Sequence, residues 1–205
     1  MSKSPFYTEE HDILRTTVRK FVEKEISPYV NEWDEAGGFP RELYKKAAEV
    51  GLLGTDFPEQ YGGSDLHDPF SHLVMTEELT RCGSGGVLAS LMSYGIGLPP
   101  ILALGNDSQK EKFIPPVLSG DNISALAITE PSGGSDVAQI KTHAKKEGEY
   151  YVVNGSKTFI TSGMRADIYT VAVRTGGPGM GGISLLVIDR DTPGFTRTSL
   201  KKMGW

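Results

Sequence analysis

The spacing of the apolar residues changes near residue 120, and this change limits the possible folds more than any other feature of the sequence. In the first half, apolar residues recur every three or four positions, as Leu14, Val18 and Phe21 do, which is typical of amphipathic helices. In the second half, short runs of β-branched and aromatic residues alternate with turn residues, which is typical of strands. The sequence therefore predicts an α+β protein, with an all-α helical domain over residues 1–120 and a β domain over residues 121–205.

Capping residues and prolines indicate helix boundaries in the first half. We expect an N-cap at Thr8 and first helical residues at Pro40 and Pro69. Ser27-Pro28 is expected to end the first helix. Residues 87–104 are apolar on nearly all sides, which predicts a buried helix broken near its two adjacent prolines, and a last short helix follows it.

Six short runs in the second half predict strands. They are residues 123–129, 142–146, 150–153, 157–161, 168–173 and 183–188. Asn154-Gly155 is the strongest hairpin signal, because both central residues of a type I′ turn need positive φ, and Glu147-Gly148 is a second candidate. Because the strands follow one another without helices between them, we expect an antiparallel β-sandwich or barrel.

Composition and charge exclude several classes of protein. The 21 Lys+Arg against 26 Asp+Glu give a formal net charge of −5, whereas a nucleic-acid-binding protein needs a basic surface. No apolar run reaches the ~18 residues that a membrane helix needs, and the N-terminal segment lacks the apolar stretch of a secretory signal. The single Cys82 and four histidines without ligand spacing argue against a disulfide or a metal site. We therefore expect a soluble, cytoplasmic protein.

Two motifs that look like cofactor or catalytic signatures have simpler explanations. Residues 177–182 match the glycine spacing of a dinucleotide-binding fingerprint, but a predicted strand follows them where that fingerprint needs a helix. The stretch from Ser64 to Asp68 contains the residue types of a hydrolase triad, yet neighbours in one loop rarely converge on a nucleophile. We interpret the first motif as a hairpin loop and the second as a turn.

Two polar segments of the β domain remain as candidates for ligand binding. In residues 127–136 a strand ends in a Thr-Glu-Pro turn, and the glycine pair after it lets the backbone approach a ligand closely. Exposed N–H groups, with the hydroxyls of Thr129 and Ser135, could clamp a phosphate or a carbonyl; alternatively the segment only reverses the chain. Further along, alternation places Phe159 and Thr161 on one face of a predicted strand, where they could flank a flat ring or belong to the core.

These segments, in their order and spacing, resemble the acyl-CoA dehydrogenase family. The motifs are Phe57-Pro58-Glu59-Gln60-Tyr61-Gly62-Gly63, Thr129-Glu130-Pro131, Gly134-Ser135-Asp136, Asn154-Gly155-Ser156-Lys157, Phe159-Ile160-Thr161 and Lys202-Met203-Gly204-Trp205. The resemblance covers essentially the whole chain. It implies an N-terminal helical domain, a middle β domain and a C-terminal four-helix domain, with FAD held between the last two.

The resemblance also implies which residues bind FAD. The expected cofactor-binding residues are Leu126, Ala127, Ile128, Thr129, Gly134, Ser135, Phe159, Ile160 and Thr161. In the family pattern the segment from Leu126 lines the flavin, and Gly134 and Ser135 lie along the phosphates. Ser135 also contacts the acyl-CoA substrate. Phe159 corresponds to an aromatic residue, often Trp, that packs against the isoalloxazine, and Thr161 corresponds to a hydroxyl near flavin N5.

The activity that the resemblance implies is FAD-dependent α,β-dehydrogenation of a fatty or branched acyl-CoA to the trans-2-enoyl-CoA. Electrons would pass to an electron-transfer flavoprotein, and the full-length enzyme would be a homo-oligomer. The family's catalytic base is a glutamate of the C-terminal domain, so we expect this chain, ending at Trp205, to hold no catalytic residue; Glu130 corresponds to a turn position. The alternatives are a flavin oxidase or monooxygenase on the same fold, or a non-catalytic module that binds CoA or flavin.

Overall fold

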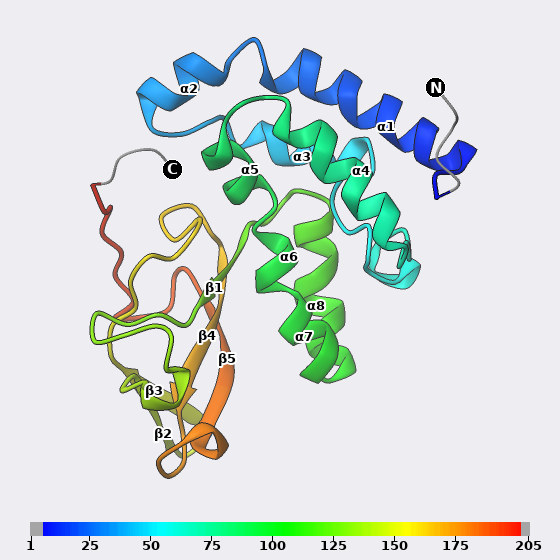
Figure 1. Cartoon of the computed structure of the whole chain (residues 1–205). Coiled ribbons are helices and arrows are strands. Elements are labelled where there is room, and N and C mark those ends of the chain that lie inside the picture. Colours follow the sequence, from blue (N-terminus) through cyan, green and yellow to red (C-terminus); the bar gives the residue numbers. More distant parts are fainter. Residues whose placement is uncertain (1–5, 202–205) are drawn as a thin grey trace. The chain divides into compact units, whose positions relative to one another are not determined.

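The computed structural model describes residues 6–201, which form two compact units (Figure 1). The first unit contains residues 6–92 and 114–121, and the second contains residues 93–113 and 122–201. The predicted order, a helical part followed by a β part, is confirmed. The helices between residues 94 and 113 group with the sheet, and the predicted domain division after residue 120 stays a prediction.

The first unit is built from helices of modest length. They are α1 (Glu9–Phe21), the π-helical turn η1 (Val22–Ile26), α2 (Val30–Ala36), α3 (Glu42–Glu49), the 3₁₀ turn η2 (Glu59–Tyr61), α4 (Pro69–Thr80), α5 (Gly85–Leu91) and the end of α8 (Asp107–Leu118). Their apolar faces form a core that includes Val18, Leu43 and Val74, all of them buried. The helical spacing read from the sequence is therefore the spacing that packs this core.

Two of the expected helix starts are confirmed by their capping geometry. Thr8 is the N-cap of α1, and its backbone N–H donates to Nδ1 of His11 at 2.9 Å. Pro69 is the first residue of α4, where its missing N–H costs nothing, and the Asp68 side chain caps the helix. Pro40 instead lies two residues before α3, within the usual uncertainty of a helix end.

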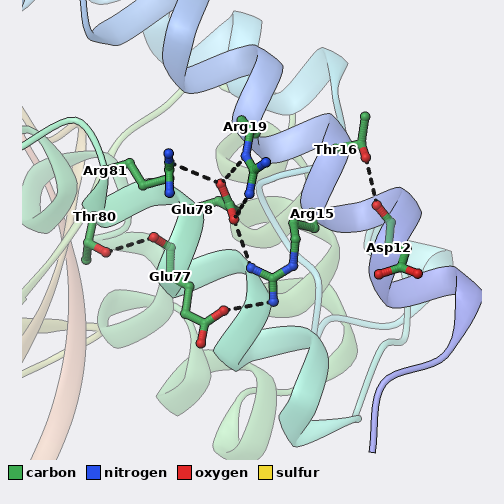
Figure 2. A network of polar contacts seen from close by, with 8 residues as sticks. All are labelled: Asp12, Arg15, Thr16, Arg19, Glu77, Glu78, Thr80 and Arg81. Atoms are coloured by element: carbon green, nitrogen blue, oxygen red, sulfur yellow. Dashed lines mark hydrogen bonds and ion pairs between the residues drawn. The ribbon is translucent and has the colours of Figure 1, made fainter. Parts of the chain in front are cut away.

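Helices α1 and α4 pack together through a buried carboxylate. Glu78 of α4 is only 1% exposed, and it accepts hydrogen bonds from Arg15 and Arg19 of α1 at 2.7–2.8 Å. Figure 2 shows both guanidinium groups turned toward it, with Arg81 on the other side. The hydrogen bonds from Arg19 and Arg15 outweigh the effect of burial and lower the pKa of Glu78 to about 2. This ionised carboxylate therefore fixes how the two helices meet.

The apolar stretch at residues 87–104 forms three helices rather than one. They are α5, α6 (Tyr94–Gly97) and α7 (Pro99–Leu104). Pro99 begins α7, so the predicted break at the proline pair is confirmed. The expectation of one continuous helix before it is wrong: the chain breaks again after Leu91, close to Gly95 and Gly97, which have low helix propensity.

The second unit contains one five-stranded sheet. Its strands are β1 (Ser124–Ala127), β2 (His143–Glu147), β3 (Tyr150–Asn154), β4 (Ile168–Arg174) and β5 (Ile183–Asp189). The order is β1-β4-β2-β3, and β5 also pairs with β4. The β2–β3 and β4–β5 pairs are antiparallel, but β4 runs parallel to β1 and to β2. The sheet is mixed, which corrects the expected antiparallel pairing: a long connection of turns and one hairpin, without a crossover helix, returns the chain parallel to β1.

The tight hairpin of this unit uses the weaker of the two turn signals. Glu147 pairs with Tyr150, and Gly148 between them has φ +62°. The prediction of a hairpin at Asn154-Gly155 is wrong, because Asn154 ends β3 and Gly155 packs against Thr142. A Cβ on Gly155 would lie 2.6 Å from the Thr142 Cα, so close backbone approach is what requires this glycine.

The predicted strand at residues 157–161 is also wrong, since this segment is a loop. Phe159 and Ser162 have φ values of +57° and +60°, which interrupt an extended chain. Residues 177–182 form the loop between β4 and β5, as predicted. The Lys-Met-Gly-Trp motif lies outside the described residues. Within residues 6–201 no single helix meets the length and hydropathy of a membrane span, and only the bent combination of α5 with α6–α7 does so jointly.

Candidate functional site

Strand β1 lies at one edge of the described sheet, so part of its backbone there has no strand partner. The Ile123 carbonyl accepts hydrogen bonds from the chain entering β4, so the alternate residues along β1 point away from β4. Two such carbonyls have partners on that outer side: Ser124 accepts from Ser93 Oγ at 3.0 Å, and Ile128 accepts from Lys157 Nζ at 2.8 Å. The N–H and C=O of Leu126, between them, face the same side. Ala127 is buried.

A tight turn follows the strand. Glu130 and Gly133 exchange two backbone hydrogen bonds of 3.0 Å, which leaves Pro131 and Ser132 at the tip. Gly134 then passes so close to Thr129 that a Cβ on the glycine would lie 3.0 Å from the Thr129 Cγ2. A side chain at the second glycine of the pair would therefore crowd the Thr129 side chain.

Glu130 joins this turn to two other segments. Its side chain accepts the backbone N–H of Lys141 at 2.7 Å and that of Thr142 at 2.8 Å, and it forms an ion pair with Lys157 at 2.9 Å. Burial raises the pKa of the carboxyl, but hydrogen bonds from Thr142, Lys141 and Lys157 outweigh it and lower the pKa to about 2. A carboxylate so strongly acidic and so fully hydrogen-bonded is unsuited to remove a proton from a substrate.

The loop at residues 156–161 lies against the same turn. Lys157 reaches back to the Ile128 carbonyl, and the Thr158 N–H donates to the Thr129 carbonyl at 2.9 Å. The two sequence segments that we expected to bind a ligand are therefore brought together by backbone and ammonium contacts.

Phe159 is the most unusual residue of this loop. It is 74% exposed and has φ +57°, an uncommon combination for an aromatic residue. Backbone strain of this kind costs of order 1–3 kcal/mol and tends to be kept at functional sites. Ile160 and Thr161, which follow it, are half-buried, whereas Ser135 of the turn is exposed. Because the loop is not a strand, the same-face argument for Phe159 and Thr161 no longer applies.

A groove of about 330 Å³ opens beside the turn. Residues 130–132, 141–143 and 154–156 line it, so it runs between the turn and the β2–β3 hairpin. None of the nine expected cofactor-binding residues is among its lining residues. The groove and the outer edge of β1 are thus two distinct surfaces that share the Glu130 turn.

The glycine-rich loop between β4 and β5 has the wrong polarity for a phosphate site. The Arg174 guanidinium donates to the carbonyls of Gly177 and Gly179 at 2.6 and 3.1 Å, and to two carbonyls of residues 138–140. A phosphate site presents N–H groups, whereas these glycines present carbonyls to a cation. The structure therefore agrees with the interpretation of this loop as a hairpin connection.

Lys157 is the residue of this site that sequence reasoning missed. It lies 27 residues after Glu130, and no local pattern pairs them. The available signal was weak: an acidic residue in one turn motif and a lysine in the other, both inside an otherwise apolar or small-residue context.

Comparison with known proteins agrees with this organisation. Residues 8–121 match the model "Acyl-CoA dehydrogenase, N-terminal domain", and residues 125–205 match "Acyl-CoA dehydrogenase, middle domain". An acyl-CoA dehydrogenase of Bacillus subtilis is 42% identical over 92% of this chain and 50% of its own length. The chain spans about half the length of such relatives.

Solved structures give the same result. A crystal structure of acyl-CoA dehydrogenase from Geobacillus kaustophilus matches with a TM-score of 0.89 and 42% identity, over 98% of this chain and 53% of that one. The acyl-CoA dehydrogenase from Bacillus anthracis, solved in complex with FAD, matches with a TM-score of 0.85 and 33% identity, over 96% of this chain and 33% of that one. With two domain models matched in order and structures this similar, the chain belongs to the acyl-CoA dehydrogenase family.

Proposed function

We propose that this chain supplies the helical and flavin-binding parts of an FAD-dependent acyl-CoA dehydrogenase. The observation that carries the proposal is the outer edge of β1, where backbone groups of Leu126 face away from the sheet, and the loop that holds the strained and exposed Phe159 is hydrogen-bonded to the end of this strand through Lys157 and Thr158. Backbone donors and acceptors along a strand edge can bind the polar atoms on the rim of a flat heterocycle. An exposed aromatic side chain can pack against the face of the same ring.

The residues of the site divide into three roles. Backbone groups of Leu126 and Ile128, with Thr129, would bind the pyrimidine side of the flavin. Gly134 and Ser135 would lie along the phosphates, where the close packing of Gly134 on Thr129 leaves room for the backbone alone. Phe159, Ile160 and Thr161 would flank the ring, Ala127 belongs to the segment that would line the flavin, and Ser135 would also contact the substrate.

The proposed reaction removes a proton from the α carbon and a hydride from the β carbon of an acyl-CoA thioester, which leaves a trans-2-enoyl thioester. The residues named above would hold FAD, which would supply the hydride acceptor for this reaction. Glu130 is not assigned as the base, because its lowered pKa makes it a weak base and its oxygens are occupied by hydrogen bonds. Electron-transfer flavoprotein as the electron acceptor, a homo-oligomeric assembly and a cytoplasmic location are further parts of the proposal that rest on the family alone.

Two glycines provide a matched test of the site. Gly134→Val should abolish saturable FAD binding, measured by quenching of flavin fluorescence, because the new side chain meets Thr129. Gly181→Val in the β4–β5 loop should bind FAD as the wild type does, since a Cβ there has no heavy atom within 4 Å. Equal loss of binding in both variants, or no FAD binding by the unaltered protein, would contradict the proposal.

The reaction class has its own test. Butyryl-, octanoyl- and palmitoyl-CoA added to the FAD-loaded full-length enzyme that contains this chain should bleach the flavin absorbance if acyl-CoA oxidation is correct, whereas this chain alone, in which no residue is assigned as the base, should show no bleaching. Thr161→Val should slow that bleaching or alter the flavin spectrum without loss of folding. Rapid reoxidation of the bleached flavin by oxygen would indicate an oxidase instead.

A further inference from the structure

A buried ion pair lies at the end of β1 beside the proposed flavin edge, and the function proposed above makes no use of it. The side chains of Glu130 and Lys157 are 4% and 10% exposed, and their charged atoms lie 2.9 Å apart. Lys157 uses a second donor on the Ile128 carbonyl at 2.8 Å. Lys157 therefore contacts the backbone of the segment expected to bind the cofactor, and Glu130 follows that segment directly after Thr129, although neither belongs to the expected set.

Stability alone is a weak explanation for such a pair. Removing two charges from water is costly, and apolar residues of similar volume often give equal or greater stability. What an apolar pair could not do is occupy the Ile128 carbonyl with a hydrogen-bond donor. With that carbonyl bound to Lys157 and the Thr129 carbonyl bound to the Thr158 N–H, two acceptors at the end of β1 are withdrawn from any ligand there.

This arrangement fixes the polarity of the strand end. A flavin carries most of its polar rim as acceptor atoms, which carbonyl oxygens would repel and N–H groups attract. The Glu130–Lys157 pair is also neutral as a whole, so it adds no net charge at the end of β1. Loss of one partner would leave a full charge in a poorly solvated place.

We propose that Glu130 and Lys157 are positioning residues for the flavin: Lys157, held by Glu130, occupies the Ile128 carbonyl with a hydrogen-bond donor, and the pair keeps the charge beside the flavin edge balanced. The inference rests on the proposed FAD site. It assigns to these two side chains an effect on cofactor affinity and on the flavin reduction potential, not a step of the reaction.

The test compares four variants of the purified protein. Glu130→Gln leaves the Lys157 cation unbalanced and should raise the potential of the bound flavin, because reduction adds negative charge to it. Lys157→Met leaves the Glu130 anion and should lower the potential. The double variant E130Q/K157M is neutral and should restore the wild-type potential, yet bind FAD about tenfold or more weakly because the Ile128 carbonyl is released. Lys145→Met removes an exposed pair with Glu147 on the hairpin and should change neither quantity.

The possible outcomes distinguish failure of this inference from failure of the proposed function on which it rests. If the wild type binds no FAD, the proposed function fails. If FAD binds and both single variants shift the potential in one direction, or neither does, the positioning role is wrong. Should a single variant fail to fold by circular dichroism, the double variant decides: wild-type FAD affinity in that protein would overturn the inference, and a tenfold loss would uphold it.

Discussion

Each of the two units contains a buried and strongly acidic glutamate, but the two carboxylates are held in different ways. Glu78 in the first unit is surrounded by arginine side chains from α1 and α4 (Figure 2). Glu130 in the second unit accepts two backbone N–H groups and faces one lysine. Both carboxyls have a pKa near 2, so equal acidity arises from unequal surroundings.

The difference lies in what remains when the carboxylate is removed. The side chains of Arg15 and Arg19 are 28% and 41% exposed, so their charges reach water without Glu78. Lys157 is 10% exposed and could not be hydrated without movement of the turn. Glu78 thus joins two helices through arginines that reach solvent, whereas Glu130 holds together three segments around a buried lysine. Similar pKa values therefore do not imply similar contributions to stability.

The largest effect on stability is expected for Glu130→Gln. Removing one partner of a buried pair typically costs about 3–5 kcal/mol, because the other charge stays buried and unpaired. Urea unfolding followed by circular dichroism measures this loss. Addition of Lys157→Met should recover part of the stability, and a double variant less stable than Glu130→Gln would contradict the comparison.

A smaller loss is expected for Glu78→Gln. The arginines can turn to solvent, so the cost should be near that of lost charge-assisted hydrogen bonds, about 1–3 kcal/mol. The same urea experiment measures this loss. Glu77→Gln is the control, because Glu77 is 46% exposed and its ion pair with Arg15 lies at the surface of this network. A cost for Glu78→Gln as great as for Glu130→Gln would remove the distinction between the two sites.

The pH dependence of unfolding reports both carboxylates at once. Each folded-state pKa is lowered from 4.5 to about 2, so the stabilisation is complete above about pH 4.5 and is lost as the pH falls toward 2. Each group contributes up to about 1.4 kcal/mol per pH unit in that window. Either Gln variant should flatten the slope, and a slope unchanged from wild type would show that folding does not lower the pKa of the mutated carboxyl.

The helical half was more predictable from sequence than the sheet because its signals are local. Thr8 and Pro69 act within one helical turn of the ends that they mark. Asn154-Gly155 carries an equally strong local signal, but its glycine is needed for contact with Thr142, 13 residues earlier in the chain. Residues 157–161 have strand composition, yet Lys157 and Thr158 bond to residues 128–130 instead.

The candidate site shows the same division. Its two segments could be identified from their residue types and from the family resemblance, and the structure brings them together. The role of each residue toward FAD stays a prediction. What joins the segments, the Glu130–Lys157 pair, depends on a contact that no pattern within either segment encodes.

The smallest effect on stability is expected for Phe159→Ala, which changes an exposed residue of the site and leaves its buried ion pair intact. At 74% exposure the ring contributes little to the packing of the chain, so the free energy of unfolding should change by less than about 0.5 kcal/mol. FAD affinity should fall, because an aromatic face beside the cofactor is lost. Phe159→Gly makes the test more specific, because glycine adopts φ +57° without strain. This variant should have a higher urea midpoint of unfolding than Phe159→Ala but no higher affinity for FAD. A loss of more than about 1 kcal/mol in the free energy of unfolding of Phe159→Ala would mean that the ring packs against protein and not against a ligand. Phe159 would then be a structural residue of the site, as Glu130 is.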